Sequence, residues 1–231
     1  MGTISKATVL SIKEYGSGIR EYTLKIMKNH YFEPGSFLQL TLEEKDDYTR
    51  WPDSRNFSIA SAFNEDGTIK LIIQKVGVYT TRIFNELHEG DSCTVKYAFG
   101  DFLLPFFDKN STICCIAGGT GIAPILSFCE QLKKGNKTER VHVFYSFKNN
   151  EENQGVEILQ SIVPKDNLHL FCTREEILGL PKKRITWNDI ESSNIDLSQS
   201  HFYICGGESF TTYFASNLKA SGAKNIYTDE W

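Results

Sequence analysis

The pattern of the sequence changes near Pro105, and this change constrains the fold more than any other feature. Before it, short segments rich in Val, Ile, Thr and aromatic residues are separated by turn signals, with one helical patch at Thr81–Leu87. Strands at this spacing favour a closed antiparallel barrel. The six expected strands are Ala7–Ile12, Ile19–Ile26, Phe37–Leu42, Phe57–Ala60, Ile69–Lys75 and Ser92–Tyr97.

After Pro105, strand-like and helical segments alternate, which favours a parallel sheet covered by helices on both faces. The first strand, Thr112–Ala117, is apolar throughout, as a strand buried on both faces should be. We therefore predict a six-stranded antiparallel β-barrel domain over residues 1–106 and a parallel-sheet α/β domain over residues 107–231. The other expected strands are Val141–Phe147, Leu168–Thr173, Phe202–Cys205 and Asn225–Thr228, and the expected helices are Pro124–Lys134, Val156–Ile162 and Ser209–Lys219.

Composition excludes several classes of protein. The net charge is −4 and no basic block is present, so nucleic acid is not an expected partner. No apolar run is long enough to span a membrane, and no apolar signal segment opens the chain, so we expect a cytoplasmic protein. A monomer is the default expectation, since no sequence feature decides the oligomeric state.

The 6 cysteines form no C-x-x-C pair and show no iron–sulfur spacing. We therefore expect neither a metal site nor a fused iron–sulfur module. Most of the cysteines lie inside apolar runs, and we expect five of them to be reduced and buried. The sixth, Cys205, is treated separately below because two glycines follow it at the end of an expected strand.

A glycine-rich segment, Ala117–Pro124, follows one expected strand and opens a helix. Glycines there allow a ligand close to the backbone, and the free N–H groups of a helix N-terminus attract a pyrophosphate. The spacing is neither G-x-G-x-x-G nor that of a P-loop. We favour dinucleotide binding over a simple connecting turn, because three glycines fall within four residues at the carboxyl end of a strand.

A second segment, Arg55-Asn56-Phe57-Ser58, could bind a phosphate and a flat ring from one barrel strand. An arginine can pair with a phosphate through two hydrogen bonds. Phe57 lies on the same face of the strand two residues later, where its ring can stack. Taken alone, this segment is better explained as an ordinary strand with an exposed arginine and a core phenylalanine.

The ordered set of motifs resembles the ferredoxin–NADP reductase family. R-x-[YF]-S in a barrel is followed by G-G-T-G-x-x-P at the head of a parallel-sheet domain. The segment Tyr203–Gly207 resembles the C-G-G signature of that family, and Ile226–Trp231 is similar to its last strand. The resemblance covers nearly the whole chain and implies that residues 1–106 bind FAD and residues 107–231 bind NAD(P).

The resemblance assigns roles in the barrel. Arg55 would hold the flavin phosphate, Phe57 would stack on the isoalloxazine in place of the commoner tyrosine, and Ser58 would reach flavin N5 as a catalytic residue. The strand Leu71–Val76 would line the flavin with its backbone, and Gly77–Thr81 would bind the pyrophosphate. Either threonine of that loop could be the ligand. The cofactor-binding residues implied here are Arg55, Asn56, Phe57, Ser58, Ile73, Gln74, Tyr79, Thr80 and Thr81.

In the second domain the resemblance implies that Thr120 touches the flavin edge or the nicotinamide and that Cys205 lies beside nicotinamide C4 as a catalytic residue. The Cys172–Glu175 segment resembles the family's [ST]-R-E segment, and Lys183–Thr186 resembles G-R-[IL]-T with lysine replacing glycine. Two arginines suit a 2′-phosphate, which favours NADP(H) over NAD(H). The implied nucleotide-binding residues are Gly119, Thr120, Thr173, Arg174, Arg184, Cys205, Gly206 and Gly207, and Trp231 would cover the flavin.

The resemblance implies an FAD-dependent NAD(P)H oxidoreductase that transfers hydride between NAD(P)H and bound FAD. Electrons would pass on to a separate acceptor such as ferredoxin or flavodoxin. FAD is favoured over FMN because it is the usual flavin of the family. Two alternatives remain open: an NAD(P)H:flavin reductase or the reductase component of an oxygenase, and a non-catalytic nucleotide-binding subunit.

Overall fold

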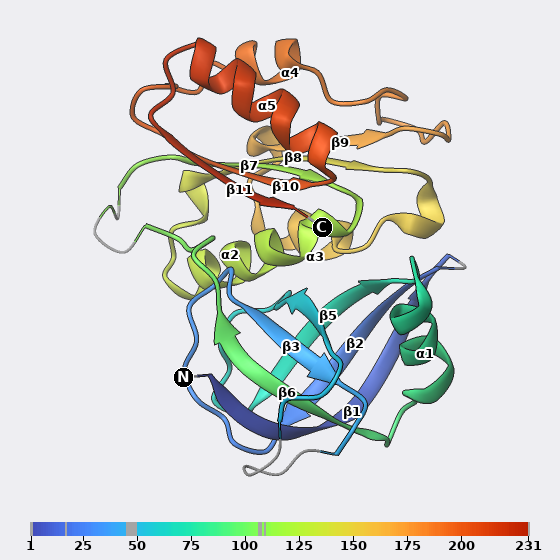
Figure 1. Ribbon diagram of the computed structural model, residues 1–231. Coiled ribbons are helices and arrows are strands. Elements are labelled where there is room, and N and C mark those ends of the chain that lie inside the picture. Colours follow the sequence, from blue (N-terminus) through green and yellow to red (C-terminus); the bar gives the residue numbers. More distant parts are fainter. Residues whose placement is uncertain (1, 17, 45–49, 106–107, 109, 231) are drawn as a thin grey trace. The chain divides into compact units, whose positions relative to one another are not determined.

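The computed structural model describes residues 2–16, 18–44, 50–105, 108 and 110–230. The chain divides into two compact units, Met1–Leu103 (unit 1) and Leu104–Trp231 (unit 2), each with its own core. The division falls just before the boundary that we expected after residue 106. Figure 1 shows the elements of each unit with their labels.

The described part of unit 1 forms a six-stranded antiparallel sheet with the order β4-β3-β6-β1-β2-β5. Just beyond β4, an antiparallel bridge joins Ile59 to Leu71 of β5, and the backbone N–H of Ala60 donates to the carbonyl of Lys70 at 2.8 Å. The two edge strands therefore meet, and the sheet is a nearly closed barrel, as predicted. The strands are β1 (Thr3–Tyr15), β2 (Ile19–Ile26), β3 (Phe37–Thr41), β4 (Arg55–Ser58), β5 (Thr68–Gln74) and β6 (Ser92–Phe99).

The barrel interior explains why these segments are strands. Alternate residues point inward and form one apolar cluster that includes Leu24, Leu40, Leu71 and Val95, each fully buried. β1 is longer than the apolar stretch Ala7–Ile12 predicted. Its first half pairs with β6 and its second half with β2, with a shift of register between Val9 and Ser11. Pairing on both sides extends the strand through its polar ends.

Helix α1 (Val78–Glu86) connects β5 to β6 and begins three residues before the Thr81 start that the sequence suggested. The reason is local. The Oγ1 atom of Thr80 accepts hydrogen bonds from the backbone N–H groups of Val76 (2.9 Å) and Gly77 (3.0 Å), which fixes the entry of the chain into the helix. The helix buries Tyr79, Ile83 and Phe84 against the barrel.

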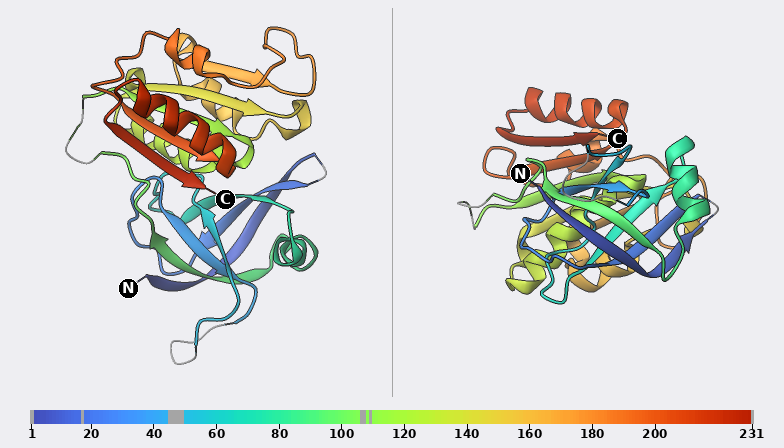
Figure 2. Two further views of the ribbon diagram at one scale, coloured as in Figure 1. Left: turned by 45° about the horizontal axis from the view of Figure 1, so that its top comes forward. Right: turned by 60° about the horizontal axis from the view of Figure 1, so that its bottom comes forward.

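Unit 2 contains a five-stranded sheet with the order β11-β10-β7-β8-β9, and every neighbouring pair is parallel. Helices cover both faces of it (Figures 1 and 2), as predicted. The strands are β7 (Ile113–Gly118), β8 (Val141–Phe147), β9 (Leu168–Cys172), β10 (His201–Gly206) and β11 (Asn225–Glu230). The helices are α2 (Ile122–Lys134), α3 (Val156–Ile162), α4 (Trp187–Glu191) and α5 (Glu208–Ala220), with short 3-10 turns at Gly119–Gly121, Thr138–Arg140, Asn150–Glu152 and Lys165–Asn167.

The order of strands in unit 2 creates a switch point between β7 and β10. From β7 the chain proceeds through β8 to β9 on one side, and later returns to place β10 and β11 on the other. Loops that follow β7 and β10 therefore leave the sheet in opposite directions from adjacent strand ends. Open α/β sheets bind ligands in the crevice that this divergence leaves.

No helix in the described ranges is long and apolar enough to cross a membrane. The described ranges include all 6 cysteines, and each is buried and unpaired.

Gly121 gives a test of the packing at the switch point. A methyl group on Gly121 would lie 2.3 Å from the carbonyl oxygen and 2.6 Å from the carbonyl carbon of Cys205, and backbone atoms cannot move aside cheaply. We expect Gly121→Ala to lower the free energy of unfolding by about 2 kcal/mol or more.

Gly207→Ala is the matched control, because Gly207 has an ordinary φ of −67° and nothing lies within 4 Å of an added methyl group. It should lower the free energy of unfolding by no more than about 1 kcal/mol, the cost of alanine at the N-cap of α5. Urea denaturation of both variants measures the difference, and equal stabilities would contradict the close contact.

Candidate functional site

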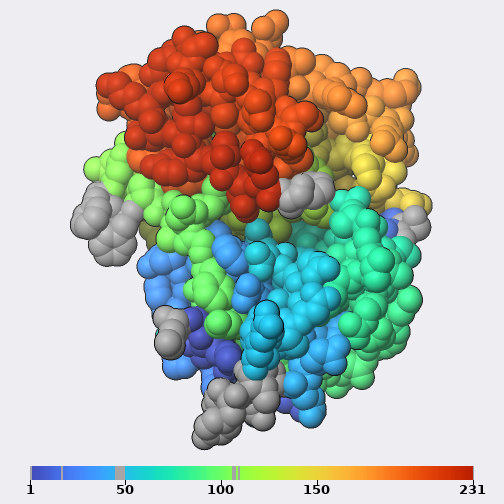
Figure 3. Space-filling view, in the orientation of Figure 1, coloured from blue at the N-terminus to red at the C-terminus, as the bar shows by residue number. Residues whose placement is uncertain are grey.

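Arg55 lies on the outer surface of unit 1 beside the start of α1. Its guanidinium carbon is 4.7 Å from the centre of the Tyr79 ring, and its Nη1 donates to Asp53 Oδ1 at 2.8 Å. Tyr79 is buried, and its hydroxyl donates to the carbonyl of Asp53 at 3.0 Å. Figure 3 shows the segment after β4 (cyan) and the α1 region (teal to green) side by side on the visible face of unit 1. An exposed cation thus stands at a helix N-terminus, which suits a phosphate group.

The sequence analysis missed a second guanidinium at this place. Arg82, one turn after Tyr79 on α1, has its guanidinium carbon 5.8 Å from the centre of the same ring. Glu43 and Glu86 hold it at 3.2 and 3.0 Å. The signal that could have identified Arg82 is its i, i+3 spacing from Tyr79, which places both side chains on one helix face.

The structure distinguishes Thr80 from Thr81, which the sequence could not do. Thr80 is buried with its hydroxyl bound to backbone groups, whereas Thr81 is exposed. The N–H of Thr81 donates to the carbonyl of Gly77 at 2.9 Å, so the hydroxyl is the donor that Thr81 can offer to a ligand. Thr80 is therefore a residue that shapes the loop, and the hydroxyl of Thr81 is the one that faces solvent.

The remaining predicted residues of unit 1 lie where β4 and β5 diverge. The bridge between Ile59 and Leu71 fixes an antiparallel register in which position 57 stands opposite position 73, yet the two strands are no longer paired there. Phe57 and Ser58 are half-buried, and Asn56 is exposed. Ile73 is fully buried, and Gln74 beside it is half-buried.

In unit 2 the two glycine motifs meet at the switch point. Cys205 of β10 pairs with Ala117 of β7, and Gly121 packs against the backbone of Cys205. The ring of Phe210 covers both motifs, because a methyl group on Gly206 would lie 2.9 Å from its Cδ1 and one on Gly118 would lie 3.5 Å from its Cε2. An added methyl group would clash at Gly206 but make only ordinary contact at Gly118, so close packing requires glycine at Gly206.

The carboxyl ends of β7 and β10 each lead into the N-terminus of a helix. The 3-10 turn Gly119–Gly121 leads from β7 into α2, and Gly207 is the N-cap residue of α5 directly after β10. Gly119 has a φ of +58°, a conformation that glycine adopts without strain. Thr120 is half-buried between the two motifs. The donors and dipoles of both helices point toward the same edge, as a dinucleotide phosphate needs.

Cys205 is buried with 1% of its surface exposed, and its Sγ lies 3.9 Å from Asp229 Oδ2. Burial, and then the nearby carboxylate of Asp229, raise the pKa of the Cys205 thiol well above its ordinary value. The residue is therefore a neutral thiol rather than a nucleophilic thiolate. It can pack against a ligand, but it is not activated to attack one.

The predicted arginines lie along the same edge beyond β8 and β9. Thr173 is anchored by its N–H and its hydroxyl to the carbonyl of Phe147, and the N–H of Arg174 donates to Lys148. An isolated bridge between Cys172 and Lys182 returns the chain to this point after the loop. The side chains of Arg174 and Arg184 are both exposed.

Lys183, which replaces the glycine of the family pattern, forms an ion pair with Asp189 at 2.5 Å. The Asp189 carboxylate also accepts from the N–H and the hydroxyl of Thr186, which caps α4. Lys183 is therefore tied to α4. The prediction for Trp231 lies outside the described residues.

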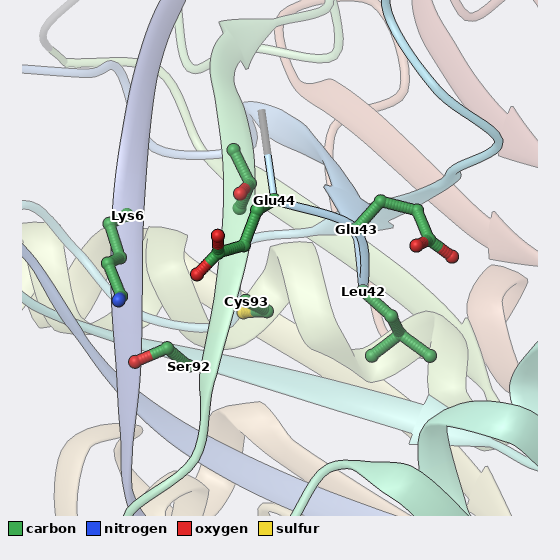
Figure 4. A pocket seen from close by; sticks show the side chains of 7 residues that line it. Lys6, Leu42, Glu43, Glu44, Ser92 and Cys93 are labelled. Carbon is green, nitrogen blue, oxygen red and sulfur yellow. The ribbon is translucent and has the colours of Figure 1, made fainter. Parts of the chain in front are cut away.

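Unit 1 also has a hollow of about 330 Å³ on another part of its surface, shown in Figure 4. Lys6 of β1, Ser92 and Cys93 of β6, and Glu43 and Glu44 after β3 line it. Burial raises the pKa of Cys93 to about 12. None of its lining residues is a predicted site residue, and its two glutamates do not suit a phosphate.

Thr80 offers a test of how the site in unit 1 is built. Thr80→Val keeps the shape of the side chain but removes the acceptor for two backbone N–H groups. We expect it to lower the free energy of unfolding by about 1–3 kcal/mol. Thr81→Val, at the exposed neighbouring position, should stay within about 0.5 kcal/mol of the unchanged protein. Denaturant titrations compare them, and a neutral Thr80→Val would contradict the assigned role.

Comparison with known proteins agrees with this geometry. Residues 115–215 match the model of the oxidoreductase NAD-binding domain family. The ferredoxin–NAD(P)⁺ reductase component of a naphthalene 1,2-dioxygenase system from Pseudomonas putida is 23% identical over 98% of this chain and 68% of its own length. A CDP-6-deoxy-L-threo-D-glycero-4-hexulose-3-dehydrase reductase from Yersinia pestis is 37% identical, but over only 39% of this chain and 28% of that protein.

A solved structure carries the comparison across both units. The ferredoxin NADP⁺ reductase from Neisseria gonorrhoeae, with bound FAD and NADP, superposes with a TM-score of 0.81 at 21% identity, covering 100% of this chain and 99% of that one. The match to the family model lies within unit 2, whereas the likeness in fold extends over the whole chain. Residues 115–215 of the chain therefore match the oxidoreductase NAD-binding domain family, and the whole chain has the fold of the ferredoxin NADP⁺ reductase.

Proposed function

We propose that the protein takes electrons from NAD(P)H onto bound FAD and passes them to a separate one-electron acceptor such as ferredoxin or flavodoxin. The observation that carries this proposal is the meeting of Gly118–Gly121 with Cys205–Gly207 at the switch point of the sheet. A ligand-binding edge of this kind, built from the glycine motifs of a reductase, has nicotinamide nucleotide as its natural ligand. When bound, the flavin supplies the ability to accept an electron pair and release it singly.

The residues of unit 1 fit FAD. Arg55 and the N-terminus of α1 present a guanidinium and N–H donors to the pyrophosphate, and the exposed hydroxyl of Thr81 adds a donor. Phe57 supplies a ring face for the isoalloxazine at the place where β4 leaves β5. Ser58 supplies a hydroxyl in that place, and the half-buried Gln74 supplies hydrogen-bonding groups.

The residues of unit 2 fit NAD(P)H. Gly119, Thr120 and Gly207 offer accessible backbone next to two helix N-termini, and Gly206 is buried beside them. The neutral thiol of Cys205 packs beside the nicotinamide without placing a negative charge there. The exposed Arg174 and Arg184 hold the 2′-phosphate, with Thr173 anchoring the backbone beside Arg174, which makes NADPH the preferred nucleotide.

A second candidate, the reductase component of an oxygenase, is a special case of the same chemistry. The Pseudomonas putida relative, a reductase component of a dioxygenase system, favours it. An NAD(P)H:flavin reductase would release its flavin. Retention of FAD by the purified protein therefore separates a flavin reductase from an enzyme that passes electrons to a protein acceptor.

Arg55 tests the flavin assignment. Loss of a charge-assisted hydrogen bond to the pyrophosphate should cost about 1.5–3 kcal/mol, so Arg55→Ala should weaken FAD binding about 10- to 150-fold. Lys28→Ala removes an exposed cation elsewhere on the barrel and should leave FAD affinity unchanged. Calorimetric titration of the apoprotein with FAD measures both. A purified protein that takes up no FAD, or an Arg55→Ala variant that binds it normally, would contradict the assignment.

Arg174 tests the choice of nucleotide. If its guanidinium binds the 2′-phosphate, Arg174→Ala should raise KM for NADPH about 10- to 100-fold. KM for NADH should not change, because NADH lacks that phosphate, and this makes NADH the internal control. Steady-state reduction of ferricyanide with each nucleotide gives both values. An equal rise in KM for NADPH and NADH would contradict this assignment, because Arg174 would then bind a group that both nucleotides contain.

A further inference from the structure

Strand β9 forms one edge of the sheet in unit 2, and its outer side carries backbone groups that face away from β8. The N–H of Thr173 donates toward β8, to Phe147, whereas the N–H of Cys172 donates outward, to the carbonyl of Pro181. Backbone groups alternate sides along a strand. Leu168 and Leu170 therefore share the outward direction of Cys172.

These outward groups have different partners. The N–H of Leu168 donates to the carbonyl of Lys165. Within the described residues, the pairing of β9 on this side is the isolated bridge from Cys172 to Lys182. The carbonyl of Leu168 and both backbone groups of Leu170 thus face outward with no strand beside them, a segment long enough for a short strand to pair with.

The loop before Lys182 turns away from this edge. If it continued the register of the bridge, Leu180 would pair with Leu170. Instead the chain makes a turn in which the N–H of Leu180 donates to Ile177 at 3.0 Å and Gly179 has a φ of +83°. Leu178 at the tip of this turn is 103% exposed. The space that a paired strand would fill is left as a groove.

The groove has a volume of about 590 Å³, within the range of binding pockets. Its walls are apolar: Val163 after α3, Leu170 and Phe171 of β9, and Leu180 and Pro181 of the returning loop. An edge strand lining an apolar groove is the arrangement by which sheets bind extended peptides, with backbone bonds supplying affinity and side-chain pockets supplying specificity.

Charge in the groove selects the partner. Lys165 is the charged side chain of the lining, it is exposed, and among the described residues it has no ion-pair partner. His169, the other ionisable group of the lining, stacks on Phe144 at 4.3 Å between ring centres. Burial lowers the pKa of His169, so this imidazole stays neutral near pH 7. The groove therefore carries one positive charge, near the amino end of β9.

We propose that the outer edge of β9 binds an extended segment of a partner protein, with alternating apolar side chains and an acidic residue that pairs with Lys165. The segment adds a sixth strand to the sheet of unit 2 by bonding to the carbonyl of Leu168 and to both backbone groups of Leu170. This site is separate from the carboxyl-end edge proposed for the nucleotide, and it does not depend on the bound flavin.

The full chain is tested with blocked peptides of alternating Val and Thr that carry Glu at both ends. Matched peptides carry Lys at both ends, or the same Glu sequence N-methylated at every peptide bond. Binding is measured by fluorescence polarisation, and protection of the Leu170 amide by hydrogen exchange. We expect the Glu peptide to bind and to slow exchange at Leu170, and the N-methylated peptide to do neither.

Two variants locate the site. Lys165→Glu should weaken the Glu peptide about fivefold or more and strengthen the Lys peptide. Gln160→Trp, on the wall formed by α3, should fill the groove and abolish binding. Ser161→Trp, exposed on the same helix but not in the lining, is its control and should bind normally.

Several results would overturn the proposal. One is no binding of the Glu peptide and no protection of Leu170 at about 1 mM peptide, the weakest affinity at which recognition would be useful. Another is equal binding of the N-methylated peptide, which would make the groove a pocket for side chains alone. A third is a dimer in sedimentation that protects Leu170 without peptide, which would identify a second copy of this chain as the occupant.

Discussion

The approach of Gly121 to the carbonyl of Cys205 is the contact on which the nucleotide edge depends. Adjacent parallel strands bring the ends of β7 and β10 together, but only a residue without a side chain lets the turn after β7 pass directly over the backbone of β10. Gly206 meets the same requirement under the ring of Phe210. The glycines are therefore packing residues first. The accessible backbone that suits a dinucleotide is a consequence of that packing.

The barrel reaches a comparable result by hydrogen bonding rather than close packing. Thr80 binds two backbone N–H groups ahead of α1, and this starts the helix early enough to bring Tyr79 beneath Arg55. Without the early start, the cation and the helix N-terminus would not lie together. A buried hydroxyl thus positions an exposed site although it has no contact with the ligand that we propose.

Much of this could be predicted from the sequence because the information is local. Short segments rich in Val, Ile, Thr and aromatic residues, separated by turn signals, identified the six barrel strands, and the unbroken apolar run at Thr112–Ala117 identified the central strand of a covered sheet. The order of short motifs then indicated the family resemblance. The sequence predicts that Gly121 and Cys205 both lie at the carboxyl ends of parallel strands. It does not predict their contact, because that depends on which strands are neighbours in the sheet.

The parts that could not be predicted depend on tertiary partners. The polar ends of β1 become strand because β2 and β6 pair with it on either side. Helix α4 is short and weakly apolar, and it exists through the cap that Asp189 and Thr186 form. The groove beside β9 follows from a turn at Gly179 that departs from an otherwise possible register.

The central claim is that the nucleotide edge of unit 2 and the flavin site of unit 1 serve one reaction. Anaerobic mixing of the FAD-loaded protein with NADPH, followed by visible absorption, tests this most directly. The account predicts that the flavin band disappears with one equivalent of nucleotide and returns when an electron acceptor such as oxidised ferredoxin is added. A flavin that stays oxidised in excess NADPH and in excess NADH would contradict it.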